Sequence, residues 1–349
     1  MSLYVDIEKK LGDFNLKAKF DTDGGVMGLL GASGCGKSYT LKCIAGIEKP
    51  DRGKIILNGE VLFDSERKID LKPQQRGVGY LFQNYALFPN MTVKQNILCG
   101  LFKEKDKSLK KQELNRVAAM LQLEDLLNHR PHQLSGGQAQ RVAMARILVN
   151  KPRVLLLDEP FSALDGHLRE QIQMQMKILL KDIGYDVIMV THSRDEAYHL
   201  CDRIAVMNEG EIVVCKETKA LFAEPEYVHA ARLTGCKNIV AAQRIGENEV
   251  FVPEWGIKLK TSSPVEKDIS AIGIRAHYFN VKAAENQYQV EYTGEMEEPF
   301  EWILRFRYKN QPKESKDIWW RMAKDKRLQR FPDTIGVNPK YILLLKNLS

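Results

Sequence analysis

Short apolar runs alternate with helix-like stretches from the N-terminus to about residue 235. Val26–Leu30, Val154–Leu157 and Val187–Val190 are fully apolar and end abruptly at polar residues, which is typical of strands buried on both faces of a sheet. Helical spacing predicts a helix from about Lys37 to Ile47 and a helical insertion over Lys107–Leu127. The alternation predicts an α/β domain with a largely parallel core sheet.

The pattern changes after about Gly235. Short alternating segments are then separated by Gly, Pro, Asn and Lys, namely Val250–Val252, Ile257–Leu259, Ile272–Ile274 and Trp302–Phe306. Segments of this kind are typical of a small β-barrel or sandwich. The sequence therefore predicts two domains: residues 1–235 with an α/β fold, and residues 236–349 with an all-β, OB-like barrel fold.

Composition sets limits on the class of protein. The chain has 349 residues, of which 44% are hydrophobic and 28% charged, and a net charge of +7; this charge permits contact with acidic headgroups or nucleotide phosphates but does not indicate nucleic-acid binding. The six cysteines form no CxxC pair or zinc-type spacing, which favours a reduced cytoplasmic compartment. No signal-like segment opens the chain, and no apolar run reaches the ~18 residues of a spanning helix. Any membrane role is therefore expected to require a partner.

A glycine-rich motif follows the first apolar run. Gly31–Ser38 fits G-x-x-x-x-G-K-[ST] between a predicted strand and a predicted helix. Such a loop folds its backbone N–H groups around an anion, its lysine reaches the outer phosphates and its hydroxyl binds Mg²⁺. A glycine-rich turn that matches by chance is the alternative. The predicted phosphate-binding residues are Gly31, Ser33, Gly34, Cys35, Gly36, Lys37, Ser38 and Tyr39.

Two carboxylates end the apolar run Val154–Leu157. The strand places Asp158 at the carboxyl edge of the sheet, where open α/β sheets bind ligands, and Asp158 can hold Mg²⁺ there. Glu159 points differently because side chains alternate along a strand, and it can act as the base for an attacking water. An acidic pair that only caps a strand is the alternative.

Four further motifs resemble those of ATP-binding cassette (ABC) ATPases. Leu134-Ser-Gly-Gly-Gln138 looks like the signature sequence of that family, and Gln83 like its Q-loop glutamine. Ser162-Ala-Leu-Asp165 looks like the D-loop, and Thr191-His192 like the switch histidine. The aromatic residue that many members place before their second strand has no match at residues 10–13, with Tyr4 and Phe14 nearby. The resemblance implies a P-loop ABC ATPase domain with a helical insertion.

The resemblance also implies how such a protein works. ATP binds the phosphate loop, and Mg²⁺ is held by Ser38, Gln83 and Asp158. Glu159, His192 and Gln83 are the implied catalytic residues. A second copy of the chain closes over the γ-phosphate through its own signature residues, Ser135, Gly136, Gly137 and Gln138. The implied partners are this second copy, transmembrane permease subunits and, indirectly, a substrate-binding protein, at the cytoplasmic face of the membrane; no nucleic acid is expected.

The implied transport substrate is less defined. Ile272-Gly-Ile-Arg275 in the second domain resembles a strand that recurs in importer ATPases with a C-terminal barrel. Within that group, Asn58–Asp64 and Arg76–Gln83 look most like ATPases of molybdate, tungstate and sulfate importers. Polyamine, iron or sugar importers are the alternative. Two alternatives belong to other functional classes: a soluble ABC-type ATPase acting on nucleic acid or ribosomes, and an inactive cassette. The basic, aromatic stretch Arg305–Lys309 with Trp319 and Trp320 is an anion sensor, a nucleic-acid contact or a solvated face over core aromatics.

Overall fold

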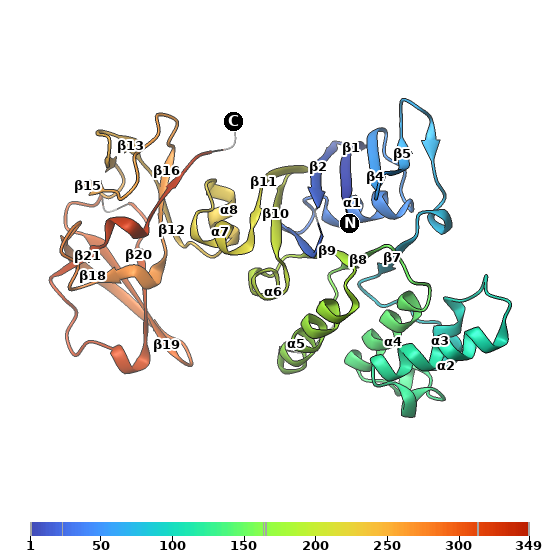
Figure 1. Ribbon diagram of the computed structural model, residues 1–349. Helices are drawn as coiled ribbons and strands as arrows, with labels where there is room; N and C mark the ends of the chain where they lie inside the picture. The colour runs from blue at the N-terminus through green and yellow to red at the C-terminus, as the bar shows by residue number, and fades with distance from the viewer. Residues whose placement is uncertain (1, 23, 163, 165, 313, 348–349) are drawn as a thin grey trace. The chain divides into compact units, whose positions relative to one another are not determined.

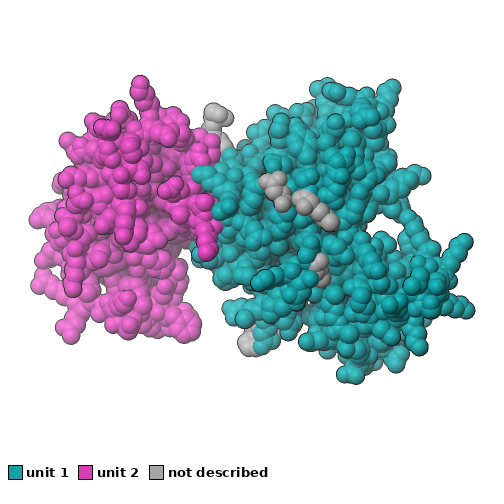
Figure 2. All heavy atoms as spheres, viewed as in Figure 1, with its two compact units in different colours: residues 1–218 teal, residues 219–349 magenta. Residues whose placement is uncertain are grey.

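The computed structural model describes residues 2–22, 24–162, 164, 166–312 and 314–347. The chain divides into two compact units, Met1–Thr218 and Lys219–Ser349 (Figure 2). The predicted boundary after residue 235 comes later, because it leaves helices α7 (Thr218–Ala223) and α8 (Val228–Leu233) in the first domain. In the structure, Val228 and Ala231 of α8 pack against strand residues of the second unit, Ala271 and Leu345.

A mixed sheet forms the centre of the first unit. Among the described residues it has eleven strands in the order β6-β5-β4-β1-β2-β11-β10-β3-β9-β8-β7 (Figure 1). The strands are β1 (Leu3–Leu11), β2 (Phe14–Thr22), β3 (Val26–Leu30), β4 (Arg52–Leu57), β5 (Glu60–Asp64), β6 (Ile69–Asp70), β7 (Val78–Leu81), β8 (Val154–Asp158), β9 (Asp186–Thr191), β10 (Arg203–Asn208) and β11 (Glu211–Glu217).

The parallel part of this sheet confirms the predicted α/β core. Strands β7, β8, β9, β3 and β10 run parallel to one another, and every residue of β8 and β9 is buried. Strands β1, β2, β4, β5 and β6 pair antiparallel, as do β10 and β11, whereas β11 pairs parallel with β2. Its parallel strands end together, since Leu81 pairs with Leu157, Asp158 with Val190 and Leu30 with Thr191.

Six helices of the first unit accompany the sheet in the described part of the chain. They are α1 (Lys37–Ala45), α2 (Val93–Cys99), α3 (Lys107–Met120), α4 (Gly136–Leu148), α5 (Gly166–Ile183) and α6 (Arg194–Leu200). Helix α3 lies in the segment predicted as a helical insertion, Lys107–Leu127, and packs with α2 and α4 (Figure 1). Two helices end earlier than predicted, because Gly46 after α1 and Gln122 after α3 take positive φ angles of 78° and 53°.

The second unit is rich in strands, as predicted. Its described strands form three sheets, ordered β12-β16-β22, β13-β14-β15 and β17-β21-β18-β19-β20, around one core that includes Trp255, Ile272 and Trp320. The strands are β12 (Asn238–Ala241), β13 (Gln243–Arg244), β14 (Glu249–Val252), β15 (Ile257–Lys260), β16 (Ala271–Ile274), β17 (Phe279–Asn280), β18 (Tyr288–Glu297), β19 (Glu301–Tyr308), β20 (Ile318–Ala323), β21 (Thr334–Val337) and β22 (Ile342–Leu345).

The basic, aromatic stretch of the second unit alternates across β19. Phe306 and Tyr308 are buried in the core, whereas the outward-facing Arg305 and Arg307 lie 3.7 and 2.6 Å from Asp317. Among the three readings of this stretch, the arrangement matches a charged face over core aromatics.

Two general features concern the whole described chain. None of its helices combines the length and the apolar character that crossing a membrane requires. All six cysteines are free thiols.

Candidate functional site

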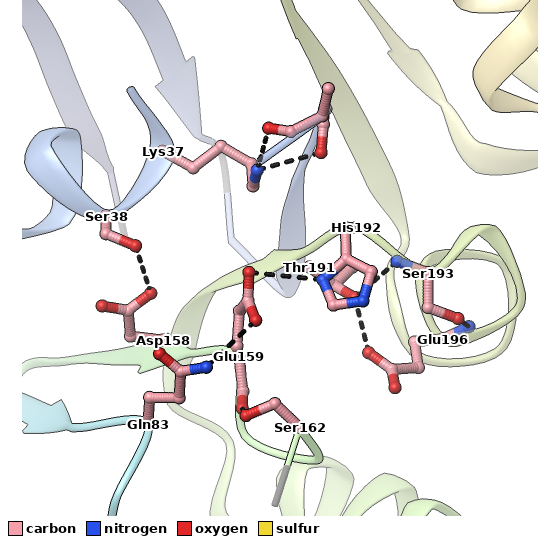
Figure 3. Close-up of polar contacts among 12 residues, drawn as sticks. Lys37, Ser38, Gln83, Asp158, Glu159, Ser162, Thr191, His192, Ser193 and Glu196 are labelled. Atoms are coloured by element: carbon pink, nitrogen blue, oxygen red, sulfur yellow. Dashed lines mark hydrogen bonds and ion pairs between the residues drawn. The ribbon is translucent and has the colours of Figure 1, made fainter. Parts of the chain in front are cut away.

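The glycine-rich loop, which is the predicted phosphate-binding turn, connects β3 to α1. Gly34 and Gly36 have φ angles of 82° and 105°, which only glycine adopts without strain. A side chain at Gly36 would also collide with Leu16 and press on the ring of Phe14. The Lys37 ammonium is buried and donates hydrogen bonds to the carbonyl oxygens of Gly31 and Ala32 at 2.9 and 2.7 Å (Figure 3). The loop therefore surrounds the ammonium group of Lys37 with its own carbonyl oxygens.

The residues flanking this lysine lie at different depths. Cys35 is buried and its sulfur lies 3.7 Å from the Lys37 ammonium. Ser33 is exposed on the loop, and Tyr39 in the first turn of α1 is 38% exposed with the Lys42 ammonium over its ring. Phe14, the aromatic residue nearest to the unmatched segment at residues 10–13, packs beside Gly36.

Asp158 connects the loop to the end of β8. The Ser38 hydroxyl donates a 2.7 Å hydrogen bond to its Oδ1 (Figure 3), and only 7% of Asp158 is exposed. A hydroxyl and a carboxylate at this distance are the hard oxygen donors that Mg²⁺ prefers. The residues present therefore fit the implied metal, and Ser38 and Asp158 would hold it.

A second hydroxyl contacts the same carboxylate, and sequence reasoning missed it. Tyr80 of β7 donates a 2.8 Å hydrogen bond to Asp158 Oδ2. Burial, followed by the Asp158 charge, raises the pKa of the Tyr80 phenol, so the phenol remains a donor. No sequence signal indicates this pair, because it depends on β7 lying next to β8.

Glu159 lies just beyond β8 in a strained conformation. Its φ angle is 45°, which costs a non-glycine residue on the order of 1–3 kcal/mol and is most frequent at functional sites. Its backbone N–H donates to Val190 of β9 at 3.1 Å. The carboxylate lies 3.3 Å from His192 Nδ1 and accepts a 3.4 Å hydrogen bond from Gln83 (Figure 3). The structure thus brings the three predicted catalytic residues together.

A buried carboxyl supports the turn that carries His192. Thr191 donates a 2.5 Å hydrogen bond to Glu196, and the Ser193 backbone N–H donates to the Thr191 hydroxyl at 2.9 Å (Figure 3). Glu196 is 6% exposed, and burial raises its pKa, although the Thr191 hydroxyl opposes the shift. Sequence reasoning missed this group, but Ser193-Arg-Asp-Glu196 fits the S-x-x-E pattern of a helix start.

The loop containing Gln83 is tied to α4. Tyr85 and Ala86 take left-handed φ angles of 58° and 43°. Their carbonyl oxygens accept hydrogen bonds from Arg146 at 2.9 and 2.7 Å, and the Tyr85 hydroxyl donates to the Pro160 carbonyl at 3.2 Å. Burial lowers the pKa of Arg146. The backbone after Gln83 is therefore held by an arginine of the signature helix.

The predicted signature residues form the start of α4. Ser135 is the N-cap: its hydroxyl accepts from the Gln138 N–H at 3.3 Å, while the Gln138 side chain accepts from the Ser135 N–H at 2.9 Å. Gly136 and Gly137 form the first turn. Within the described residues, no hydrogen bond or ion pair joins this turn to the glycine-rich loop of the same chain. Of the D-loop, Ser162 hydrogen-bonds to the Glu159 carbonyl at 2.9 Å, and Ala163 and Asp165 lie outside the described residues.

Comparison with known proteins gives the same family. Residues 15–162 match the family model described as ABC transporter. The chain is 44% identical over 239 residues to the spermidine/putrescine import ATP-binding protein PotA of Nitratidesulfovibrio vulgaris, an alignment covering 68% of this chain and 60% of that relative. It is 37% identical to PotA of Oleidesulfovibrio alaskensis, covering 85% and 80%. It is 39% identical to the Fe(3+) ions import ATP-binding protein FbpC of Haemophilus influenzae, covering 75% of each chain.

A solved structure is similar as well. The ATP-binding cassette MJ0796, in a dimeric post-hydrolysis state bound to ADP and Pi, is 30% identical and has a TM-score of 0.51, over 62% of this chain and 99% of that one. The PotA and FbpC relatives are named for polyamine or iron import, and they do not support the oxyanion specificity expected from the sequence. The chain belongs to the family of ABC transporter ATP-binding proteins, and its first unit is an ABC ATPase domain.

Proposed function

We propose that this chain is the ATP-hydrolysing subunit of an ABC importer, acting as a homodimer docked on transmembrane permease subunits. The observation that carries the proposal is the cluster at one sheet edge, where Ser38 bonds Asp158 and Glu159 contacts both His192 and Gln83. Ser38 and Asp158 are suited to hold a metal, whereas Glu159, His192 and Gln83 are suited to act on the attacking water. The dimeric cassette MJ0796 supports the homodimer.

Each residue then has a chemical role. The loop N–H groups and Lys37 bind the phosphates of ATP. Mg²⁺, held by Ser38 and Asp158 with Gln83 nearby, would neutralise charge on the phosphate oxygens. Glu159 orients the attacking water and accepts its proton, and His192 contacts the γ-phosphate. Ser135 of the partner subunit, at a helix N-terminus, adds a second set of anion-binding donors, so closure of the dimer depends on the γ-phosphate.

The proposed substrate is a polyamine of the spermidine/putrescine class, with Fe(3+) as the second candidate. The names of the relatives in Nitratidesulfovibrio vulgaris, Oleidesulfovibrio alaskensis and Haemophilus influenzae support this order over an oxyanion. The protein is then expected at the cytoplasmic face of the membrane, held there by its permease, with a substrate-binding protein as an indirect partner. Uptake of labelled spermidine, Fe(3+) and molybdate by vesicles containing the assembled importer distinguishes the three substrates.

Sedimentation with and without Mg-ATP tests the motor itself. Wild type is expected to hydrolyse ATP, and Glu159→Gln to bind ATP and sediment as a dimer only when Mg-ATP is present. Lys37→Ala is the control, because it removes the cation enclosed by the phosphate loop. A Glu159→Gln protein that binds ATP and stays monomeric at every concentration contradicts the shared site. Purification of the tagged chain with nucleic acid instead of membrane subunits would favour the soluble ATPase alternative.

A further inference from the structure

The Asp158 carboxylate is held at both of its oxygens. Oδ1 accepts from Ser38 at 2.7 Å and Oδ2 accepts from Tyr80 at 2.8 Å. Both distances are in the range of strong O–H···O⁻ hydrogen bonds. Asp158 is buried, so water does not replace either donor freely. The carboxylate therefore has one orientation, fixed by two hydroxyl groups from different elements.

Tyr80 is itself fixed by its surroundings. It lies in β7, where it pairs with Leu156 of β8, two residues before Asp158. Its ring is half-buried, packs against the core of the first unit and lies 4.5 Å from the ring of Phe82. The phenol oxygen therefore reaches the end of the neighbouring strand from a rigid position.

The two hydroxyl groups differ in what they can do when a metal is bound. The Ser38 oxygen is itself a ligand in the proposed site, and it shares Asp158 Oδ1 with the metal there. Tyr80 has no such second role, and its bond to Oδ2 can persist. We propose that Tyr80 is a positioning residue that holds Asp158 Oδ2 and thereby presents Oδ1 to the divalent cation of Mg-ATP. This inference rests on the proposed metal role of Asp158.

Supporting hydrogen bonds of this kind have measurable consequences. Loss of a group that orients a metal ligand typically weakens metal affinity or activity by about 10–100-fold. A tyrosine that only fastens β7 to β8 would instead affect stability without a specific effect on the metal. Metal affinity measured apart from turnover separates the two roles.

The experiment measures Mn²⁺ binding to the full-length chain saturated with ADP, by electron paramagnetic resonance. Tyr80→Phe keeps the ring and removes the donor, and we expect Mn²⁺ to bind about 10-fold more weakly. Affinity for ADP in EDTA should equal that of wild type, because Tyr80 contacts the carboxylate and not the phosphate loop. All titrations are run well below the lowest melting temperature of the set.

Tyr85→Phe is the matched control. Tyr85 is buried and, like Tyr80, donates its hydroxyl, but to the Pro160 carbonyl, so its loss should leave Mn²⁺ affinity unchanged. The inference is overturned if Tyr80→Phe and Tyr85→Phe weaken Mn²⁺ binding equally, or if Tyr80→Phe binds Mn²⁺ with wild-type affinity. Asp158→Asn separates this failure from that of the proposed function. If Asp158→Asn weakens Mn²⁺ and Tyr80→Phe does not, only the role of Tyr80 is wrong; if Asp158→Asn also binds as wild type, the metal role of Asp158 is wrong.

Discussion

Two groups of side chains at the same sheet edge differ in how tightly they are held. The metal-side group (Ser38, Tyr80 and Asp158) is joined by hydrogen bonds of 2.7 and 2.8 Å around a carboxylate that is 7% exposed. The water-side group (Gln83, Glu159 and His192) is joined by contacts of 3.3 and 3.4 Å, and the His192 side chain is 60% exposed.

The difference follows from what each group has to do. A metal ligand must be oriented before the metal arrives. Groups that act on the γ-phosphate and water reach their final geometry only when nucleotide and the partner subunit are present, and catalytic hydrogen bonds are often long before that point. The metal-side group is therefore expected to govern binding and the water-side group to govern turnover.

The largest effect is expected from the neighbouring carboxylates. Glu159→Gln should lower ATP turnover by about 10²–10⁴-fold, the usual contribution of a general base, and leave Mg-ATP affinity unchanged. Asp158→Asn should instead abolish the gain in nucleotide affinity that Mg²⁺ provides. Single-turnover hydrolysis and nucleotide titrations with and without Mg²⁺ measure both. Similar loss of Mg-ATP affinity in the two variants would remove the distinction between the groups.

His192→Ala is expected to have the next largest effect on turnover. Removal of one donor aimed at developing charge typically lowers the rate by about 10²-fold. The melting temperature should not change, because the side chain is largely exposed. His199→Ala, an exposed histidine of α6, is the control and should hydrolyse ATP as wild type. A turnover loss of less than about threefold, below ~1 kcal/mol, would leave His192 without a role in the reaction.

Local features of the site were predictable from the sequence. The apolar run Val154–Leu157 followed by Asp158 and Glu159 fixed both the strand and its end, because a buried strand reads as a continuous apolar run. The start of the helix at Lys37, directly after the glycines of the phosphate-binding motif, was predicted correctly. Its early end was also readable, since Gly46 is a common stop signal, but the apolar Ile47 extended the helical pattern.

Features that depend on strand order were not predictable. Tyr80 and Asp158 are far apart in the sequence, and their contact requires β7 to lie beside β8. The antiparallel pairing of β1, β2 and β4 was missed for the same reason, because alternation in a single strand does not identify its neighbour. The left-handed conformation of Glu159, whose N–H donates to Val190 of β9, was likewise not predicted.

The pH dependence of stability in Glu196→Gln tests the buried carboxyl that supports the turn carrying His192. Burial raises the pKa of Glu196 in the folded protein, so the folded state binds this proton more tightly than the unfolded state. Its stability contribution is therefore present below the unfolded pKa of about 4.3 and is lost as pH rises through the folded pKa. Glutamine does not ionise, so the variant should gain stability relative to wild type as pH rises toward neutral.

Melting temperatures of both proteins across the acid to neutral range check this sign. Asp195→Asn, next to it on α6 but with its side chain 73% exposed, should follow the wild-type curve. If the Glu196→Gln and wild-type curves stay parallel, Glu196 does not titrate differently in the two states.

The smallest effect is expected at Gln83. Its 3.4 Å hydrogen bond to Glu159 is at the long end of the usual range, and the residue is exposed. Such a bond contributes about 0.5–1.5 kcal/mol, so Gln83→Ala should lower turnover of the purified chain by about 2–10-fold and leave its melting temperature unchanged. Asn84→Ala, an exposed amide in the same loop, is the control for loop perturbation. A loss as large as that of Glu159→Gln would mean that Gln83 fixes the base or the metal directly, and the water-side group would then be as tightly coupled as the metal-side group.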